Sequence, residues 1–233
     1  MTFKVKIRYI ILNNILCDWT NCVRGDEMLL EYLQKNYKVN EPIFVSDIDL
    51  PVTDTNLRQM FKILCDNGKI NRYDTGIYYM KGASRLKGGT SLSASEVAKY
   101  KYVSRNNRVD GYYSGYTFAN QLGITMQVPY MIEIVSNKAS AKCREVSVKN
   151  QRIMLRKPRT EITNENYRIL QLLDLLKDLG QYTDDDMAVA AERIGAYIKK
   201  LEIQRTKVDE YIVLFPDRVY KYIYEMRLYD AFA

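Results

Sequence analysis

Four polar residues in one predicted helix have side chains of the kind that read DNA bases. We expect this helix to begin after Thr53 and to end at the Asn67-Gly68 pair, because threonine caps helix N-termini and glycine closes helices. On a helical wheel Leu57, Met60, Phe61 and Leu64 share one face, and four polar residues lie within about 100° of one another on the opposite face. The polar residues are Thr55, Arg58, Gln59 and Lys62. Arginine suits guanine and glutamine suits adenine in the major groove, so this face predicts DNA contacts; an ordinary solvated helix face is the alternative.

Two further helices and a hairpin flank the predicted reading helix. The segment that starts at Asp26 has helical spacing and stops before Pro42, and Ser46 can cap a very short helix that ends by Pro51. Residues 69–80 predict two strands around an Asp-Thr-Gly turn. Three helices followed by a hairpin are typical of a winged helix-turn-helix, which we assign to residues 1–82. Its expected DNA contacts are Thr55, Asn56, Arg58, Gln59, Lys62, Lys69, Arg72 and Tyr73.

The chain has no histidine, which removes many common catalytic arrangements. Ser-His and Cys-His nucleophile pairs, HExxH zinc sites and the usual base at neutral pH all need one. The four cysteines, Cys17, Cys22, Cys65 and Cys143, include no CxxC pair and are expected to be reduced thiols in a cytoplasm. We therefore expect no enzymatic activity, no bound metal and no cofactor.

Two groups of carboxylates could suggest a metal site. Asp184, Asp185 and Asp186 are consecutive, so on a helix they diverge by about 100° each, and stabilising the N-terminus of a helix capped by Thr183 explains them better. Glu133, which is followed by basic strands, resembles the carboxylate of a metal-dependent nuclease. The spacing of a PD-ExK motif is missing, and a cross-strand charge pair explains Glu133 as well. The nuclease is kept as an alternative function.

Positive charge is concentrated in the middle of the chain. Residues 1–82 hold 11 Lys+Arg against 10 Asp+Glu, residues 83–160 hold 14 against 4, and residues 161–233 hold 10 against 14. The basic block predicts a surface for a polyanion or for an acidic protein partner, and a solvated surface without a partner is the alternative. We assign this partner surface to Arg144, Lys149, Arg152 and Arg156.

The remaining sequence predicts a mixed α/β domain with a C-terminal helical bundle, over residues 83–233. A connection rich in glycine and serine, residues 82–95, precedes it. Helices are expected at 95–102 and before Gly123, strands at 128–136, 143–148 and 151–158, and helices again from Thr163 and from Pro216 onward. The tyrosines at helical spacing predict packing in the core or in a homodimer interface. No stretch has the length of apolar residues that a membrane span needs, so we expect a cytoplasmic α+β protein.

Motifs in both predicted domains are similar to the AbiEi family, the antitoxins of abortive-infection type IV toxin–antitoxin systems, and to related transcriptional regulators. They are FVSDIDLPVTDTNLRQMFKILCDNGKINRYDTGIYY at 44–79, SASEVAKY at 93–100, GYYSGYTFANQLGITMQVPYMIEIVSNKAS at 111–140 and VLFPDRVYKYI at 213–223. The resemblance implies a winged helix that binds promoter DNA to repress its own operon, and a second domain that counteracts a nucleotidyltransferase-like toxin. A protein- or RNA-interaction adaptor without specific DNA binding is the alternative. This wing differs from the family pattern, since its only basic residues are Lys69 and Arg72.

Overall fold

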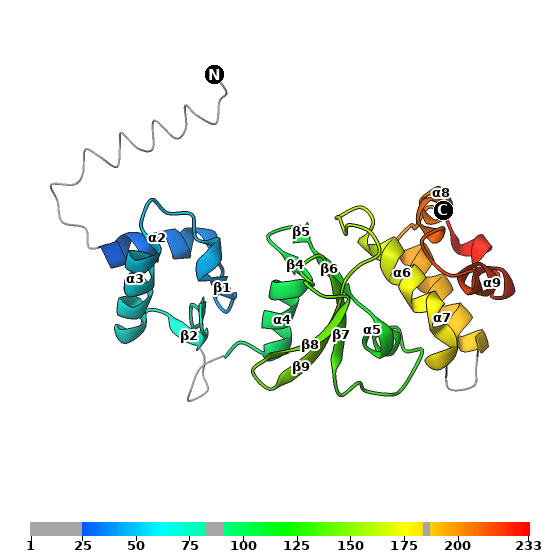
Figure 1. Ribbon diagram of the computed structural model, residues 1–233, viewed down its shortest axis with the longest axis horizontal. Coiled ribbons are helices and arrows are strands. Elements are labelled where there is room, and N and C mark those ends of the chain that lie inside the picture. The colour runs from blue at the N-terminus through cyan, green and yellow to red at the C-terminus, as the bar shows by residue number, and fades with distance from the viewer. Residues whose placement is uncertain (1–24, 83–90, 184–186) are drawn as a thin grey trace, which may run out of the picture. The chain divides into compact units, whose positions relative to one another are not determined.

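The computed structural model describes residues 25–82, 91–183 and 187–233, which form a mixed α+β protein (Figure 1). The chain divides into two compact units, one up to Leu92 and one from Ser93 onward. This division falls inside the connection expected at 82–95. The units are described separately below.

Within residues 25–82, the N-terminal unit contains two α-helices and a short 3-10 helix. These are α2 (Gly25–Asn36), η1 (Val45–Asp47) and α3 (Asp54–Asp66). The predicted cap of α3 is confirmed, because the Thr53 side chain accepts a hydrogen bond from the backbone N–H of Asn56. Gly68, just after α3, has φ +67°, a left-handed conformation that glycine adopts without a steric penalty. The prediction that Ser46 caps the short helix is wrong, because the 3-10 helix begins at Val45, so Ser46 lies inside it and Phe44 occupies the cap position.

The unit also contains a three-stranded antiparallel sheet. Two of its strands follow α3 in the sequence, and the third precedes α3. β2 (Asn71–Asp74) and β3 (Ile77–Tyr79) form the predicted hairpin, and β1 (Ile43–Phe44) pairs with β3, giving the order β1-β3-β2. β1 was not predicted, since a two-residue strand has no periodicity to detect. The core of the unit is formed by side chains of α2, α3 and β1 together with the residues just before β2 and just after β3. These residues are Leu29, Leu33, Ile43, Leu57, Met60, Phe61, Leu64, Ile70 and Met80.

The second unit is built on a four-stranded sheet with the order β6-β7-β9-β8. The strands are β6 (Gly111–Tyr113), β7 (Ile132–Ser136), β8 (Cys143–Val148) and β9 (Gln151–Arg156). β7 and β9 are parallel, whereas the β6–β7 and β8–β9 pairs are antiparallel. A two-stranded ribbon, β4 (Ser104–Arg105) with β5 (Arg108–Val109), precedes this sheet.

Helices cover both faces of this sheet. α4 (Ala94–Tyr102) lies on one side, and the helices from α5 onward lie on the other (Figure 1). Those helices are α5 (Gly115–Gln121), α6 (Tyr167–Lys177), α7 (Met187–Lys200), α8 (Arg205–Ile212) and α9 (Arg218–Glu225). The leucine-rich α6 is buried along almost its whole length, and the main core of the unit forms around it. This pattern confirms the helical C-terminal region that the apolar spacing predicted.

Several predicted boundaries differ from the structure. α4 is capped by Ser93 and Glu96 in a capping box, so it begins earlier than predicted. The single helix predicted after Pro216 is wrong, because Arg227 adopts φ +51° and separates α9 from a 3-10 helix, η3 (Leu228–Ala231). The predicted strand at 128–136 forms only from Ile132, since the residues before it run as an irregular segment. Asp184, Asp185 and Asp186 lie outside the described residues.

Within the part of the chain that the structure describes, no helix is both long enough and apolar enough to cross a membrane.

Candidate functional site

The outer face of α3 is the first candidate site. Thr55, Arg58, Gln59 and Lys62 are all exposed, whereas Leu57, Met60, Phe61 and Leu64 of the same helix are buried in the core of the unit. Ile63 is the exception among its aliphatic residues, since it is 44% exposed. Within the described residues, the side chains of Arg58, Gln59 and Lys62 form no hydrogen bond or ion pair with the protein. The structure therefore places these groups where an external partner can reach them, as the wheel predicted.

Not all the DNA contacts predicted for the hairpin are available in the structure. Lys69 and Arg72 are exposed, but the Arg72 guanidinium donates hydrogen bonds to the carbonyl of Asp74 (3.4 Å) and the hydroxyl of Thr75 (3.3 Å), which braces the turn. Tyr73 is only 7% exposed, because alternation along β2 turns it away from the surface that carries Arg72. The prediction that Tyr73 contacts DNA is therefore not supported, whereas Asn56 is exposed in the first turn of α3.

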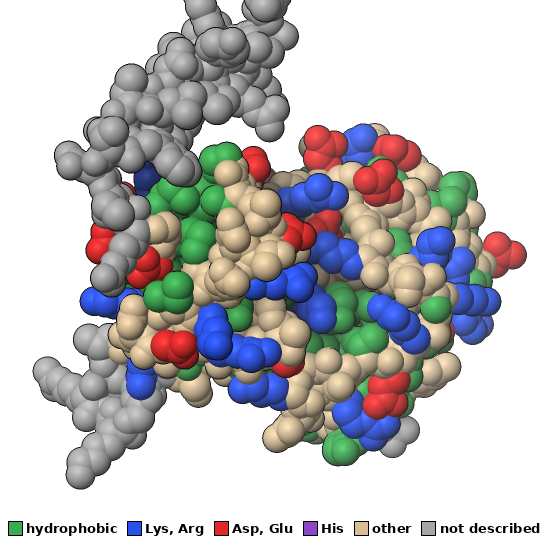
Figure 2. All heavy atoms as spheres, turned by 60° about the vertical axis from the view of Figure 1, so that its left-hand side comes forward, with side chains coloured by type: hydrophobic (Ala, Val, Ile, Leu, Met, Phe, Trp, Pro, Cys, Tyr) green, Lys and Arg blue, Asp and Glu red, His purple; other side chains and the backbone are tan. Residues whose placement is uncertain are grey.

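The four residues of the predicted basic partner surface do not share one surface. Arg144 lies opposite Leu155 in the β8–β9 ladder, so it is on the other face of the sheet from Arg152 and Arg156. Lys149 is in the two-residue connection between these strands. Arg152 forms a two-pronged ion pair with Glu145 and stacks over the Tyr130 ring at 5.2 Å. Basic and acidic side chains are interspersed on the face shown in Figure 2.

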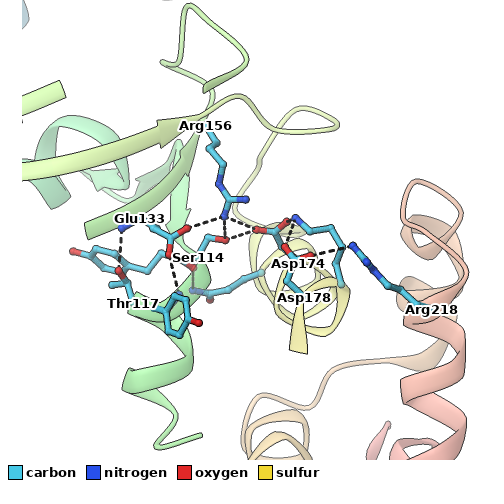
Figure 3. A network of polar contacts seen from close by, with 11 residues as sticks. Ser114, Thr117, Glu133, Arg156, Asp174, Asp178 and Arg218 are labelled. Atoms are coloured by element: carbon cyan, nitrogen blue, oxygen red, sulfur yellow. Dashed lines mark hydrogen bonds and ion pairs between the residues drawn. The ribbon is translucent and has the colours of Figure 1, made fainter. Parts of the chain in front are cut away.

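Arg156 belongs instead to a polar cluster beneath the sheet, the second candidate site (Figure 3). Its Nη2 donates a hydrogen bond to Ser114 Oγ at 2.6 Å and lies 3.5 Å from carboxylate oxygens of both Glu133 and Asp174. Ser114 Oγ in turn donates to Asp174 Oδ2. We name these four residues, Ser114, Glu133, Arg156 and Asp174, the polar cluster. It connects the end of β6, β7, β9 and α6, which are far apart in the sequence.

Charges continue from the polar cluster towards the last helices. Lys177 Nζ lies 2.8 Å from Asp174 Oδ1 and 3.0 Å from Asp178 Oδ2, and Arg218 on α9 contacts Asp178 at 3.1 Å (Figure 3). Burial alone would raise the pKa of the Asp174 carboxyl, but Arg156 and Lys177 hold this pKa below its usual value. Burial would likewise lower the pKa of the Arg156 guanidinium, whereas Asp174 and Glu133 raise it above its usual value. Asp174 and Arg156 are therefore both charged at neutral pH.

Glu133 also fixes the start of α5. Its Oε1 accepts a hydrogen bond from the backbone N–H of Tyr116 at 3.0 Å, and its own N–H donates to Thr117 Oγ1 at 2.9 Å. Gly115 has φ +56°, and a Cβ added there would come within 2.1 Å of the Glu133 carboxylate. Gly115 is therefore required both for its backbone conformation and for this close approach.

The arrangement of the polar cluster fits a structural role better than catalysis. Ser114 is 2% exposed, and its hydroxyl group donates its proton to a carboxylate that stays ionised. The Arg156 guanidinium keeps its proton at neutral pH and is held in ion pairs, so it cannot act as a general base for this hydroxyl group. Glu133 is paired diagonally with Arg156 on the neighbouring strand, as the charge-pair interpretation expected. Among the described residues, no three Cys, Asp or Glu side chains are grouped so that they could hold a metal ion.

Sequence reasoning missed Ser114 and Asp174. A signal for Asp174 was present, because it interrupts the leucines of ILQLLDLLK on a helix that is otherwise apolar. A carboxylate in such a position needs a buried partner. The sequence did not identify Arg156 as this partner, because Arg156 comes close to Asp174 only through the parallel pairing of β7 with β9.

Residues 30–206 match the model of DUF6088, a family of unknown function. The match covers most of the chain and includes parts of both compact units. No curated protein matches the chain significantly.

Proposed function

We propose that this chain, which belongs to the DUF6088 family, is a cytoplasmic DNA-binding transcriptional regulator. Its N-terminal unit is interpreted as a winged helix-turn-helix, with α3 as the reading helix and the β2–β3 hairpin as the wing. The order of helices and strands and the three-stranded sheet support this interpretation.

The observation that carries the proposal is the exposed polar face of α3. Arg58, Gln59 and Lys62 occupy a rigid helix whose opposite face is fully packed, and they are not engaged elsewhere among the described residues. Side chains of these types on such a helix can form hydrogen bonds with base edges and neutralise phosphates in a major groove.

The test uses the double variant Arg58→Ala/Lys62→Ala and the promoter DNA of the protein's own gene. Both side chains point away from the core, so we expect an unchanged fold. Binding to this DNA should weaken by about 1 to 3 kcal/mol for each side chain that no longer reaches a base. Binding is measured by fluorescence anisotropy, with melting temperature measured in parallel.

The matched control is Lys199→Ala/Lys200→Ala, which removes the same charge from exposed positions at the end of α7. If both double variants bind DNA as tightly as the unmodified chain, α3 is not the reading helix and a protein- or RNA-interaction adaptor becomes the better interpretation. An equal weakening in both would indicate only a general charge effect.

The second unit is proposed to counteract a nucleotidyltransferase-like toxin, by its resemblance to AbiEi antitoxins. The motifs at 93–100, 111–140 and 213–223, which carry the resemblance, all lie in this unit. Co-expression with a nucleotidyltransferase-like gene from the same operon tests it. Cells should survive with the chain and with Arg58→Ala/Lys62→Ala, and a failure of that variant to protect would tie protection to DNA binding alone.

A further inference from the structure

One end of the four-stranded sheet carries three exposed basic side chains. They are Arg144 on β8, Lys142 just before β8 and Lys157 just after β9. Among the residues that the structure describes, none of the three takes part in an ion pair or a side-chain hydrogen bond. Arg152 and Arg156 on β9 differ in this respect, since both form ion pairs. We name Lys142, Arg144 and Lys157 the basic edge.

The pairing of β8 with β9 brings the basic edge together. The backbone N–H of Lys157 donates a hydrogen bond to the carbonyl of Lys142 at 3.1 Å, so the two lysines are opposite each other where the ladder ends. Opposite residues of an antiparallel pair have Cβ atoms about 4.5 to 5.5 Å apart, and Arg144 follows Lys142 by two residues, roughly 7 Å along a strand. Like charges at such distances repel one another, so an external anion that neutralises them would bind favourably.

The last turn of α4 adds positive charge beside the basic edge. Ser136, at the end of β7, donates a hydrogen bond from its Oγ to the carbonyl oxygen of Tyr102 at 2.6 Å, which fixes the end of α4 on this part of the sheet. The parallel register of β7 and β9 places Ser136 beside Lys157. Lys99 and Lys101 belong to the last turn of α4, and Lys99 is exposed. The cations of α4 and of the basic edge therefore lie at the same end of the sheet.

A carboxylate at this end of the sheet is already neutralised. Asp110 precedes β6 and is 5% exposed, and its two oxygens contact Arg108 at 2.8 Å and Lys138 at 3.0 Å. It therefore does not offset the charge of the basic edge.

This surface suits phosphate groups better than a protein partner. Protein interfaces usually contain apolar or aromatic anchors, and the exposed large apolar side chains among the described residues include none from α4, β8 or β9. Interfaces with DNA are more polar and much more positively charged. Two of the three residues are lysines, which contact phosphate as point charges on flexible stems.

We propose that the basic edge binds the phosphate backbone of double-stranded DNA and so gives the second unit its own contact with DNA. The choice of DNA as the polyanion rests on the proposed function. The N-terminal unit supplies little net charge, since residues 1–82 hold 11 Lys+Arg against 10 Asp+Glu and Arg72 is engaged within its hairpin. Phosphate contacts strengthen binding to every sequence, whereas contacts of α3 with bases would select the sequence.

The test measures binding of the full chain to two duplexes of equal length over a series of salt concentrations, by fluorescence anisotropy. One duplex is the promoter DNA of the protein's own gene and the other has the same bases in scrambled order. For Lys142→Gln/Arg144→Gln/Lys157→Gln we expect an affinity at least about 10-fold lower at low salt, and a slope of log K against log salt that is flatter by roughly 2 to 3. Both duplexes should lose affinity equally, because phosphate contacts carry no sequence information.

Two control variants separate this contact from a general effect of charge. Arg193→Gln/Lys199→Gln/Lys200→Gln removes one arginine and two lysines from exposed positions on α7, and it should bind both duplexes as the unmodified chain does. Lys142→Arg/Arg144→Lys/Lys157→Arg keeps the charges of the basic edge, so it should keep the salt slope. Melting temperatures measured in parallel show whether each variant is folded.

Several results would overturn the proposal. They are an unchanged salt slope in the neutralised variant, an equal effect of the α7 control, a loss confined to the promoter duplex, or weakened binding of single-stranded RNA with duplex binding intact. An unchanged slope would leave only a protective role for charges on an edge strand.

Arg58→Ala/Lys62→Ala shows whether the proposed function fails independently. If that variant keeps its preference for the promoter duplex while neutralising the basic edge weakens both duplexes, the basic edge binds DNA and α3 is not the reading helix. The reverse pattern keeps α3 as the reading helix and rejects the basic edge. A chain that binds neither duplex would reject both.

Discussion

Arg58 and Arg156 show that the same type of side chain has opposite environments in the two units. Arg58 is exposed on α3 and has no ion pair within the described residues, whereas Arg156 is partly buried and contacts Ser114, Glu133 and Asp174. From the sequence, Arg156 counted towards a basic partner surface together with Arg144, Lys149 and Arg152. A charged side chain is available to a partner only when no opposite charge of the same protein pairs with it. The net charge of a sequence segment therefore overstates the charge that its surface presents to a partner.

The largest expected effect that distinguishes the two arginines is on stability. Arg156→Ala leaves the Asp174 carboxylate buried with Lys177 as its remaining cation, and removing one member of a buried ion pair typically costs about 3 to 5 kcal/mol. We expect a decrease of this size in the free energy of unfolding, measured by urea denaturation. A decrease below about 1 kcal/mol would show that the polar cluster does not hold the sheet to α6.

A smaller decrease is expected when the polar cluster is disturbed through the backbone. In Gly115→Ala the new methyl group would displace the Glu133 carboxylate, so the left-handed strain adds to a weakened charged hydrogen bond, together about 2 to 4 kcal/mol. Gly68→Ala is the control, because Gly68 also has a positive φ but no atom within 4 Å of the added Cβ. Equal destabilisation of the two variants in urea denaturation would mean that the contact with Glu133 contributes nothing.

The smallest change in the free energy of unfolding is expected for the exposed arginine, Arg58. Arg58→Ala removes a solvated side chain from α3, and such surface substitutions usually change stability by no more than about 0.5 kcal/mol. The same denaturation series measures it beside Arg156→Ala. A cost for Arg58→Ala close to that of Arg156→Ala would remove the contrast between the two arginines.

Local patterns predicted the N-terminal unit better than the second unit. The two faces of α3, its cap at Thr53, its closing glycine and the β2–β3 hairpin all depend on residues close together in the sequence. The polar cluster depends on β9 lying beside β7, a pairing that no local pattern encodes. The break after α9 was equally hidden, because an arginine, not a glycine or proline, adopts the left-handed conformation there.

The exposed segment before β7 shows a second limit of sequence reasoning. Residues 128–131 have the composition of a strand, and the prediction extended the strand through them. In the structure they stay outside the sheet, which leaves Val128 and Tyr130 exposed along a cavity that Glu133 and Met154 also line. A high β-propensity indicates that a residue suits a half-buried surface. It does not indicate whether the residue is buried by its own chain.

The pairing of β7 with β9 gives the polar cluster one more consequence. Side chains alternate between the faces of a strand, so a shift of β9 by one residue along β7 would turn Arg156 to the opposite face, and in one direction it would bring the apolar Leu155 into the place of Arg156. The buried carboxylate would then be without its arginine. Asp174 and Glu133 therefore destabilise a shifted register of β9 and stabilise the observed one. In this way the polar cluster specifies the register of β9 along β7.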